Sequence, residues 1–163
     1  MSDERHAIRE AAAEDLGDVL ALLDSAGLPR EGVAEHLAGF LVARDAAGRL
    51  VGCVGLERHG ALGLLRSAAV APGLQGSGLG TRLVSELLER AGGAGVREVL
   101  LLTTTARDFF VRRFGFAEAR REEYDLRLAR SPEWNLPRCS TAVLLRLELG
   151  GPPAWLTPGG PAA

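Results

Sequence analysis

Leu64 to Ala91 reads LLRSAAVAPGLQGSGLGTRLVSELLERA, and this stretch decides the fold. It begins with a nearly unbroken apolar run that Pro72 and Gly73 stop, which is typical of a buried strand. From Leu79 onward, apolar residues recur at helical spacing. The glycines between the two segments leave backbone N–H groups uncovered where the helix begins, and the positive end of the helix dipole favours a phosphate there. The stretch therefore predicts a strand, an anion-binding loop and a helix.

Two common phosphate-binding loops differ from this one. A P-loop needs a lysine after its last glycine, but Thr81 follows Gly80 and the chain contains no lysine. A dinucleotide fingerprint needs a later third glycine and an acidic residue about 20 positions on. Here the third glycine comes one position early, and the next expected strand ends in three threonines at 103–105. The P-loop is excluded and the dinucleotide loop ranks low.

The segment resembles the GCN5-related N-acetyltransferase (GNAT) family, over roughly residues 8–149. The family pattern Gln-x-x-Gly-x-Gly is matched by Gln75, Gly78 and Gly80, five residues after the strand end at Val70. The resemblance implies acetyl-CoA as cofactor, with main-chain amides of the loop around its pyrophosphate. The cofactor-binding residues that it implies are Ala68, Val70, Gln75, Gly76, Ser77, Gly78, Leu79, Gly80, Thr81 and Phe110.

The resemblance also implies an α/β fold with a mixed, mostly antiparallel sheet of six or seven strands. Helices are expected on both faces, with a V-shaped splay between two central parallel strands. The hydrophobic pattern predicts strands at 8–9, 40–44, 50–57, 64–70, 96–102 and 141–149, and helices at 11–26, 33–37, from 79 onward and around 109–113. A capping box over 105–108 is expected to begin the last helix.

Size and composition set the broad class. The chain has 163 residues, 47% of them hydrophobic and 25% charged, which is typical of a globular domain. We expect one domain over 1–149 and a disordered Pro/Gly-rich tail over 150–163. A net charge of −2 offers no basic stripe for nucleic acid, and no apolar run is long enough to cross a membrane. The charged N-terminus is unlike a signal peptide, so a cytoplasmic location is expected.

The two cysteines, Cys53 and Cys139, are far apart in sequence, so two reduced thiols are expected rather than a disulfide or a metal site. An arsenic-binding role for either thiol ranks low against simple packing in the core.

A second family motif usually reads Ala, three residues, Tyr, three residues, Gly-Phe. Counting from Ala106 places the tyrosine at Phe110, whereas counting back from Gly115 places it at Val111, so one residue is inserted here. Neither candidate is a tyrosine, and the only tyrosine of the chain is Tyr124. In the family this hydroxyl often protonates the departing thiolate; here solvent or the bound ammonium has to supply the proton.

Acetyl transfer to an amine needs an oxyanion donor and a base. By resemblance, the backbone N–H of Val70 is the oxyanion donor. An amine with a pKa near 10 is mostly protonated at neutral pH, so a base is required. Glu57, at the end of the neighbouring expected strand, is the first candidate, directly or through water, and His59 is the second. An exposed acid at a strand end and a surface histidine are the structural alternatives.

Arg66 interrupts an otherwise apolar strand, so it needs a partner. A substrate carboxylate and a protein acid such as Glu57 are equally open. Trp134 either packs over the acceptor or belongs to the core. Further candidates, each more simply explained as solvated charge, are Arg30, Glu31, Glu35 and His36 for the acceptor and Arg107, Arg112 and Arg113 for the coenzyme phosphates.

The segments 52–57, 64–67, 101–105 and 109–110 further resemble amino-acid N-acetyltransferases and arsenic-resistance-associated acetyltransferases. This implies a small-molecule amine, an amino acid or an amino-acid-like compound, as acceptor, and the family is compatible with a homodimer. Two alternatives remain open. One is a module that binds acetyl-CoA without turnover, which the missing tyrosine favours; the other is an enzyme that acetylates protein N-termini or lysines.

Overall fold

The computed structural model describes residues 6–137 and 141–150. Its helices are α1 (Leu16–Ala26), α2 (Leu79–Gly93) and α3 (Arg107–Phe114). Its strands are β1 (Ile8–Glu10), β2 (Phe40–Arg44), β3 (Leu50–His59), β4 (Leu62–Val70), β5 (Glu98–Thr103), β6 (Ala117–Glu118) and β7 (Val143–Glu148). The expected tail lies almost wholly outside the described residues, as does Cys139.

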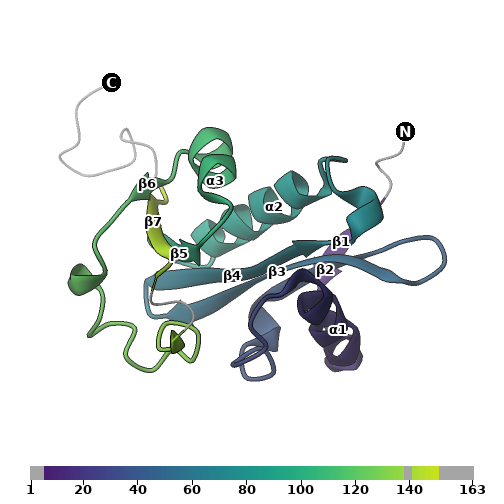
Figure 1. Cartoon of the computed structure of the whole chain (residues 1–163), viewed down its shortest axis with the longest axis horizontal. Helices are drawn as coiled ribbons and strands as arrows, with labels where there is room; N and C mark the ends of the chain where they lie inside the picture. The colour runs from purple at the N-terminus through teal and green to yellow at the C-terminus, as the bar shows by residue number, and fades with distance from the viewer. Residues whose placement is uncertain (1–5, 138–140, 151–163) are drawn as a thin grey trace.

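The seven strands form one sheet in the order β1-β2-β3-β4-β5-β7-β6. Only β4 and β5 pair in parallel, and α2 makes the crossover between them. Figure 1 shows α1 on one face of the sheet and α2 and α3 on the other. The predicted fold class, a mostly antiparallel sheet with helices on both faces, is confirmed.

The alternation of side chains along the strands builds a separate core on each face. On one face Leu41 and Val54 pack with Leu83 of α2 and Phe110 of α3. On the other face Phe40 and Cys53 pack beneath α1. A third cluster, on the half of the sheet around β4, β5 and β7, is covered by the irregular segment that follows β6, and it consists of Leu62, Leu64, Leu100, Tyr124, Leu128, Trp134 and Leu144.

A β-bulge divides β4 into two parts. Gly55 of β3 pairs with Arg66 and Cys53 pairs with Ala69, so two residues of β4 lie opposite one residue of β3. Ser67, in the bulge, has a φ of 62°, which a residue with a side chain rarely adopts. Such strain persists only where surrounding structure holds it, and here Ser67 Oγ accepts a hydrogen bond from Arg66 Nε at 2.9 Å.

Two local predictions were wrong. Of the expected helix at 33–37, residues 33–36 form turns, and Leu37 begins a short 3₁₀ helix over Leu37–Gly39. The capping box over 105–108 is absent, because α3 begins after Ala106 and the Thr103 hydroxyl accepts the Ala106 N–H at 2.8 Å. A threonine at the end of β5 thus replaces the expected cap.

Asp15 joins the N-terminal strand to the sheet through a buried carboxylate. It accepts hydrogen bonds from Arg9 at 2.8 and 3.0 Å, from Arg44 at 2.8 Å and from the Ala12 N–H at 2.7 Å. The Arg9 hydrogen bond is the main cause that holds the Asp15 pKa well below its usual range, although burial acts in the opposite direction.

We expect Asp15→Asn to destabilise the fold by about 1–3 kcal/mol, because it leaves two arginines without their carboxylate. A depressed carboxyl pKa stabilises the fold above the ordinary pKa of about 3.9, and this contribution is lost as the pH falls. The difference in Tm between the two proteins should therefore narrow below about pH 4. Asp24→Asn, at an exposed ion pair with Arg30, is the control and should change the Tm little. A Tm gap that does not depend on pH would contradict this assignment.

Candidate functional site

The glycine loop before α2 presents free backbone donors at the helix N-terminus. Gly76 and Gly78 have φ values of 84° and 91°, the left-handed region that favours glycine. Their N–H groups donate to no acceptor among the described residues, whereas the Ser77 N–H donates to Leu74 O and the Leu79 N–H to Ser77 Oγ. Gln75 holds the loop to the end of β4 through a 3.4 Å hydrogen bond from Nε2 to Val70 O. These donors suit the pyrophosphate of acetyl-CoA.

β4 and β5 separate next to this loop. Their parallel pairing runs only from Leu62 to Leu65 on β4, while β4 continues to Val70. The Ala71 N–H donates to Val51 O on β3, and because successive amides of a strand point to opposite edges, the Val70 N–H points to the edge that β5 has left. This is the V-shaped splay that the family resemblance implies, and it leaves the Val70 N–H on its open edge.

A pocket of about 150 Å³ occupies the splay. Its lining includes four of the predicted cofactor residues, Ala68, Val70, Gly80 and Phe110. The remaining ones, Gln75 to Leu79 and Thr81, form the loop and the first turn of α2 beyond it. An apolar slot that leads to a set of free amides fits a thioester and its pantetheine arm, with the phosphates at the helix N-terminus.

No residue lining this splay pocket carries a hydroxyl, within the part of the chain that the structure describes. Phe110, rather than Val111, lines it, and its ring packs edge-on against Phe116. Tyr124 lies in the third core cluster, where its hydroxyl donates to Glu98 at 2.6 Å. Cys53 lines the pocket too, but burial raises the pKa of its thiol to about 12, so it stays protonated.

Glu57 and Arg66 form a buried ion pair on the α1 face, with 2.7 Å between Oε2 and Nη1 and no exposed side-chain surface on either residue. The Ser131 hydroxyl donates to Glu57 Oε1 at 2.6 Å, and His59 Nε2 lies 3.2 Å from the same oxygen. Of the two partners considered for Arg66, the structure shows the protein acid. Glu57 is buried and both of its carboxylate oxygens have partners, so it is not an exposed acid at a strand end.

Two loops close over Arg66. Arg66 Nη2 donates to Pro29 O at 3.2 Å, and the backbone of Gly32 lies so close that a Cβ there would be 3.1 Å from Nη1 and 2.9 Å from the Pro132 ring. Ser131 and Pro132 belong to the second loop, and the next residue, Glu133, is 94% buried. Ser131 and Glu133 carry no signal in the sequence, because no periodicity in an irregular segment distinguishes a buried acid from a solvated one.

Trp134 lies in the third core cluster rather than over a pocket. It is 3% exposed, and its indole N–H donates to Asp125 at 2.9 Å. The structure therefore corrects its candidate role as a lid, since burying the ring against Leu62 and Leu64 uses its apolar surface in the core.

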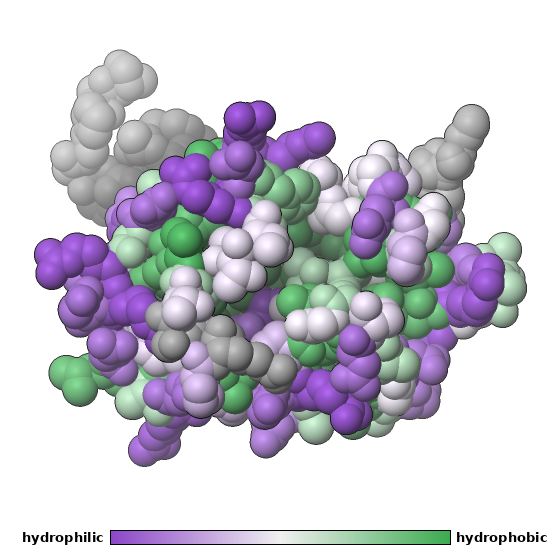
Figure 2. Space-filling view, in the orientation of Figure 1, coloured by the Kyte–Doolittle hydropathy of each residue, from purple (hydrophilic) through white to green (hydrophobic). Residues whose placement is uncertain are grey.

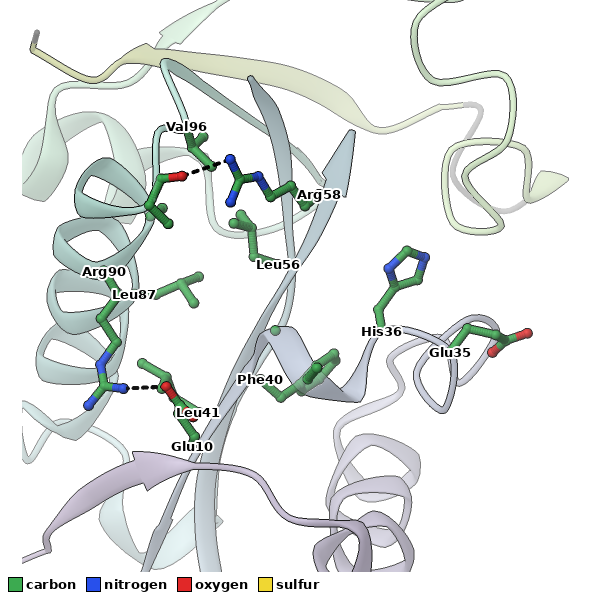
Figure 3. Close-up of a pocket in the computed structure, with 14 residues that line it drawn as sticks. Glu10, Glu35, His36, Phe40, Leu41, Leu56, Arg58, Leu87, Arg90 and Val96 are labelled. Atoms are coloured by element: carbon green, nitrogen blue, oxygen red, sulfur yellow. Dashed lines mark hydrogen bonds and ion pairs between the residues drawn. The ribbon is translucent and has the colours of Figure 1, made fainter. Parts of the chain in front are cut away.

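Glu35 and His36 line a different and larger pocket, of about 430 Å³, at the edge of β3 that β2 leaves uncovered. Figure 3 shows these two residues on one side of the strands, and Leu87 and Arg90 of α2 on the other. This pocket is thus separate from the one at the glycine loop. The His36 and His59 rings lie 6.1 Å apart, so the two regions approach each other through these histidines.

The remaining charged candidates lie on the surface. Arg107 pairs with Glu118 at 2.5 Å, and Arg30 with Asp24 at 3.4 Å. Figure 2 shows hydrophilic and apolar residues interspersed over this face of the molecule. No helix among the described residues has the length and hydrophobicity needed to cross a membrane.

Comparison with known proteins agrees with this geometry. The family model of the acetyltransferase (GNAT) domain matches residues 36–118, which run from the turn before β2 to β6 and contain the splay and the glycine loop. The chain belongs to the GNAT family. Acetyl-CoA is the cosubstrate of this family of N-acetyltransferases, and the splay pocket and loop of this chain fit it.

The relatives that this chain matches include amino-acid acetyltransferases. One from Ralstonia nicotianae is 30% identical over 149 residues, which cover 86% of this chain and 32% of the relative. The structure of N-acetylglutamate synthase from Neisseria gonorrhoeae with coenzyme A and N-acetyl-glutamate superposes with a TM-score of 0.74 at 27% identity, over 89% of this chain and 35% of that one. This GNAT chain spans about a third of the length of these relatives.

A solved structure of similar size is Rv2747 from Mycobacterium tuberculosis in complex with CoA and NLQ. It has a TM-score of 0.73 and 26% identity, over 88% of this chain and 99% of that chain. A structure with coenzyme A thus also exists for a chain of similar length, which is covered almost completely by the superposition.

Proposed function

We propose that this chain transfers the acetyl group of acetyl-CoA to the primary amine of an amino acid or an amino-acid-like small molecule. The observation that carries the proposal is the splay pocket, which joins the Val70 N–H to the free amides of the glycine loop. An activated thioester held there lies beside a donor for the developing oxyanion, which is what acyl transfer requires.

The residues of the chain bind the cofactor and stabilise the charge that develops during acyl transfer. Gly76, Gly78 and the first turn of α2 hold the phosphates, and Phe110 and Ala68 form walls that exclude water from the thioester. The N–H of Val70 donates to the carbonyl oxygen as negative charge develops on it. Acetyl-CoA itself supplies only an activated acetyl group and a good leaving group.

Support for an amino-acid-like acceptor comes from the relatives, whose names and bound ligands are those of amino-acid acetyltransferases. The buried polar cluster of Glu57, Arg66 and Ser131, beneath the loops at 29–32 and 131–134, is a second reason to expect a small polar acceptor rather than a protein chain. Each guanidinium nitrogen of Arg66 already has a protein partner, so an acceptor carboxylate has to share this arginine with Glu57 or bind elsewhere.

The test is thiol release from acetyl-CoA with a panel of amino acids, their decarboxylated amines, polyamines and amino-acid-like antibiotics, with calorimetric cofactor binding alongside. Peptides with free N-termini complete the panel, and we expect turnover with amino acids or their analogues and less with these peptides. Tight binding of acetyl-CoA without turnover on any amine would indicate a sensor module instead. Turnover only on peptides would indicate a protein acetyltransferase.

A further inference from the structure

One carboxylate oxygen of Glu133 is buried and has no hydrogen-bond partner in the described part of the chain. Glu133 is 6% exposed, and this oxygen is its Oε1. Leaving a buried carboxylate unpaired costs free energy, so such a group usually has a bound partner in the working state. Glu57, by contrast, has Arg66, Ser131 and His59 around its two oxygens.

With Glu133 ionised, the charges around it are one positive charge short of neutrality. Arg66 and Glu57 are the charged groups that act on it, and they neutralise each other in their ion pair. His59 Nε2 lies 3.2 Å from Glu57 Oε1, the oxygen that also accepts from Ser131. An ionised Glu133 therefore gives the cluster a net negative charge. An ammonium group would balance this charge and supply the missing hydrogen-bond donor.

The position also suits an acceptor. Arg66 is two residues before Ala68, which lines the splay pocket, and the bulge at Ser67 lies between them. Glu133 is held next to Arg66 by the loop Ser131–Trp134, which contacts the loop at Gly32 through Pro132. An amine at Glu133 would thus lie between the two loops and beside the splay.

We infer that Glu133 binds the ammonium group of the acceptor and removes one of its protons, an inference that rests on the function proposed above. The ammonium transfers a proton to Glu133 Oε1 and becomes a neutral amine. The amine nitrogen then forms a bond to the acetyl carbon, the carbon–sulfur bond breaks, and its electron pair leaves on the thiolate. The second proton of the nitrogen goes to the thiolate, and Glu133 returns its proton to solvent, so charge and atoms balance.

The acidity of Glu133 agrees with this role. Burial raises its pKa to about 7, with a smaller opposing effect of Arg66 and a further increase from Glu57. A base with a pKa near the working pH combines a sizeable ionised fraction with good proton affinity. Below about pH 7 the carboxyl is protonated and cannot accept, so kcat/KM should fall on the acidic side of this pH.

The deciding variant is Glu133→Gln, which keeps the size of the side chain and removes its ability to accept a proton. With the best amine of the panel, we expect kcat/KM to fall by about 10²–10⁴-fold and the acidic limb near pH 7 to disappear, while acetyl-CoA binding by calorimetry stays the same. Glu133→Asp should recover part of the rate and keep the limb. Glu123→Gln, at an exposed acid of the same segment, is the matched control and should behave as the wild type.

A second measurement does not depend on turnover. In ¹³C NMR of protein labelled at the glutamate carboxyls, the signal absent from Glu133→Gln belongs to Glu133. Its pKa should fall when methylammonium chloride is added, and not when potassium chloride is added at the same ionic strength. If methylammonium shifts the Glu133 pKa but the wild-type protein turns over no amine, the cation site stands and the acetyl transfer proposed above is rejected. An unshifted signal, or an unchanged pH profile in Glu133→Gln, would overturn the inference itself.

Discussion

Replacing Gly78 with aspartate is expected to weaken acetyl-CoA binding by at least about 100-fold, a loss of roughly 2.7 kcal/mol. Gly78 precedes α2 with a φ of 91°, and a Cβ there meets no protein atom within 4 Å. The new side chain would therefore enter the open space in front of the helix N-terminus, where the phosphates are expected. Its negative charge would also repel them at the point where the dipole should attract. Isothermal titration calorimetry with acetyl-CoA measures the effect.

The control for this substitution is Gly48→Asp. Gly48 lies in the turn between β2 and β3 with a φ of 87°, and a Cβ there also meets nothing within 4 Å. Both variants thus carry the same backbone strain, of about 1–3 kcal/mol, but only one lies at the phosphate site. Equal cofactor affinity in the two variants would mean that the glycine loop does not bind the pyrophosphate.

Arg66→Met is expected to cost about 3–5 kcal/mol of folding free energy, which is the usual effect of breaking a buried ion pair by removing one partner. The cost arises because Glu57 remains buried, with only Ser131 and His59 as partners. The variant also loses the hydrogen bonds to Ser67 Oγ and Pro29 O, which hold the bulge and the first loop. Urea unfolding monitored by circular dichroism gives the change.

The matched variant is Glu57→Leu together with Arg66→Met. Replacing both partners of a buried pair by apolar groups is often nearly neutral, so the double variant should be more stable than Arg66→Met alone. The coupling energy from the complete cycle should be favourable to the pair. If the single variant loses less than about 1 kcal/mol, the pair is more hydrated than the structure indicates.

The half of the chain that binds the cofactor could be predicted because its signals are local. The apolar run of β4, the glycines at 76, 78 and 80 and the helical spacing of α2 lie next to one another in sequence, and each follows from backbone physics. Their arrangement in the structure is as predicted. The cap of α3 differed because Thr103 reaches forward from the strand, a competition between nearby hydroxyls that residue types alone do not resolve.

The acceptor half could not be predicted in the same way. Its groups come from loops far apart in the chain, and burial, not residue type, gives them their properties. Arg66 signalled a need for a partner, but the sequence could not show which acid supplies it. Glu133 gave no signal at all, because only the folded chain removes it from water. Trp134 turned out to be a core residue for the same reason.

The close approach of Gly32 to Pro132 places the acceptor side of the protein in two loops, apart from the elements that hold the cofactor. Both residues lie in loops outside the strands and the glycine loop, so substitutions around them leave the cofactor half intact. A lineage could therefore exchange one small amine for another by altering exposed positions at 30–36, while Ser131, Glu133 and Trp134 of the second loop stay because they are buried. The strands and the glycine loop would be inherited unchanged, so new acceptor specificities could arise while the cofactor site is kept.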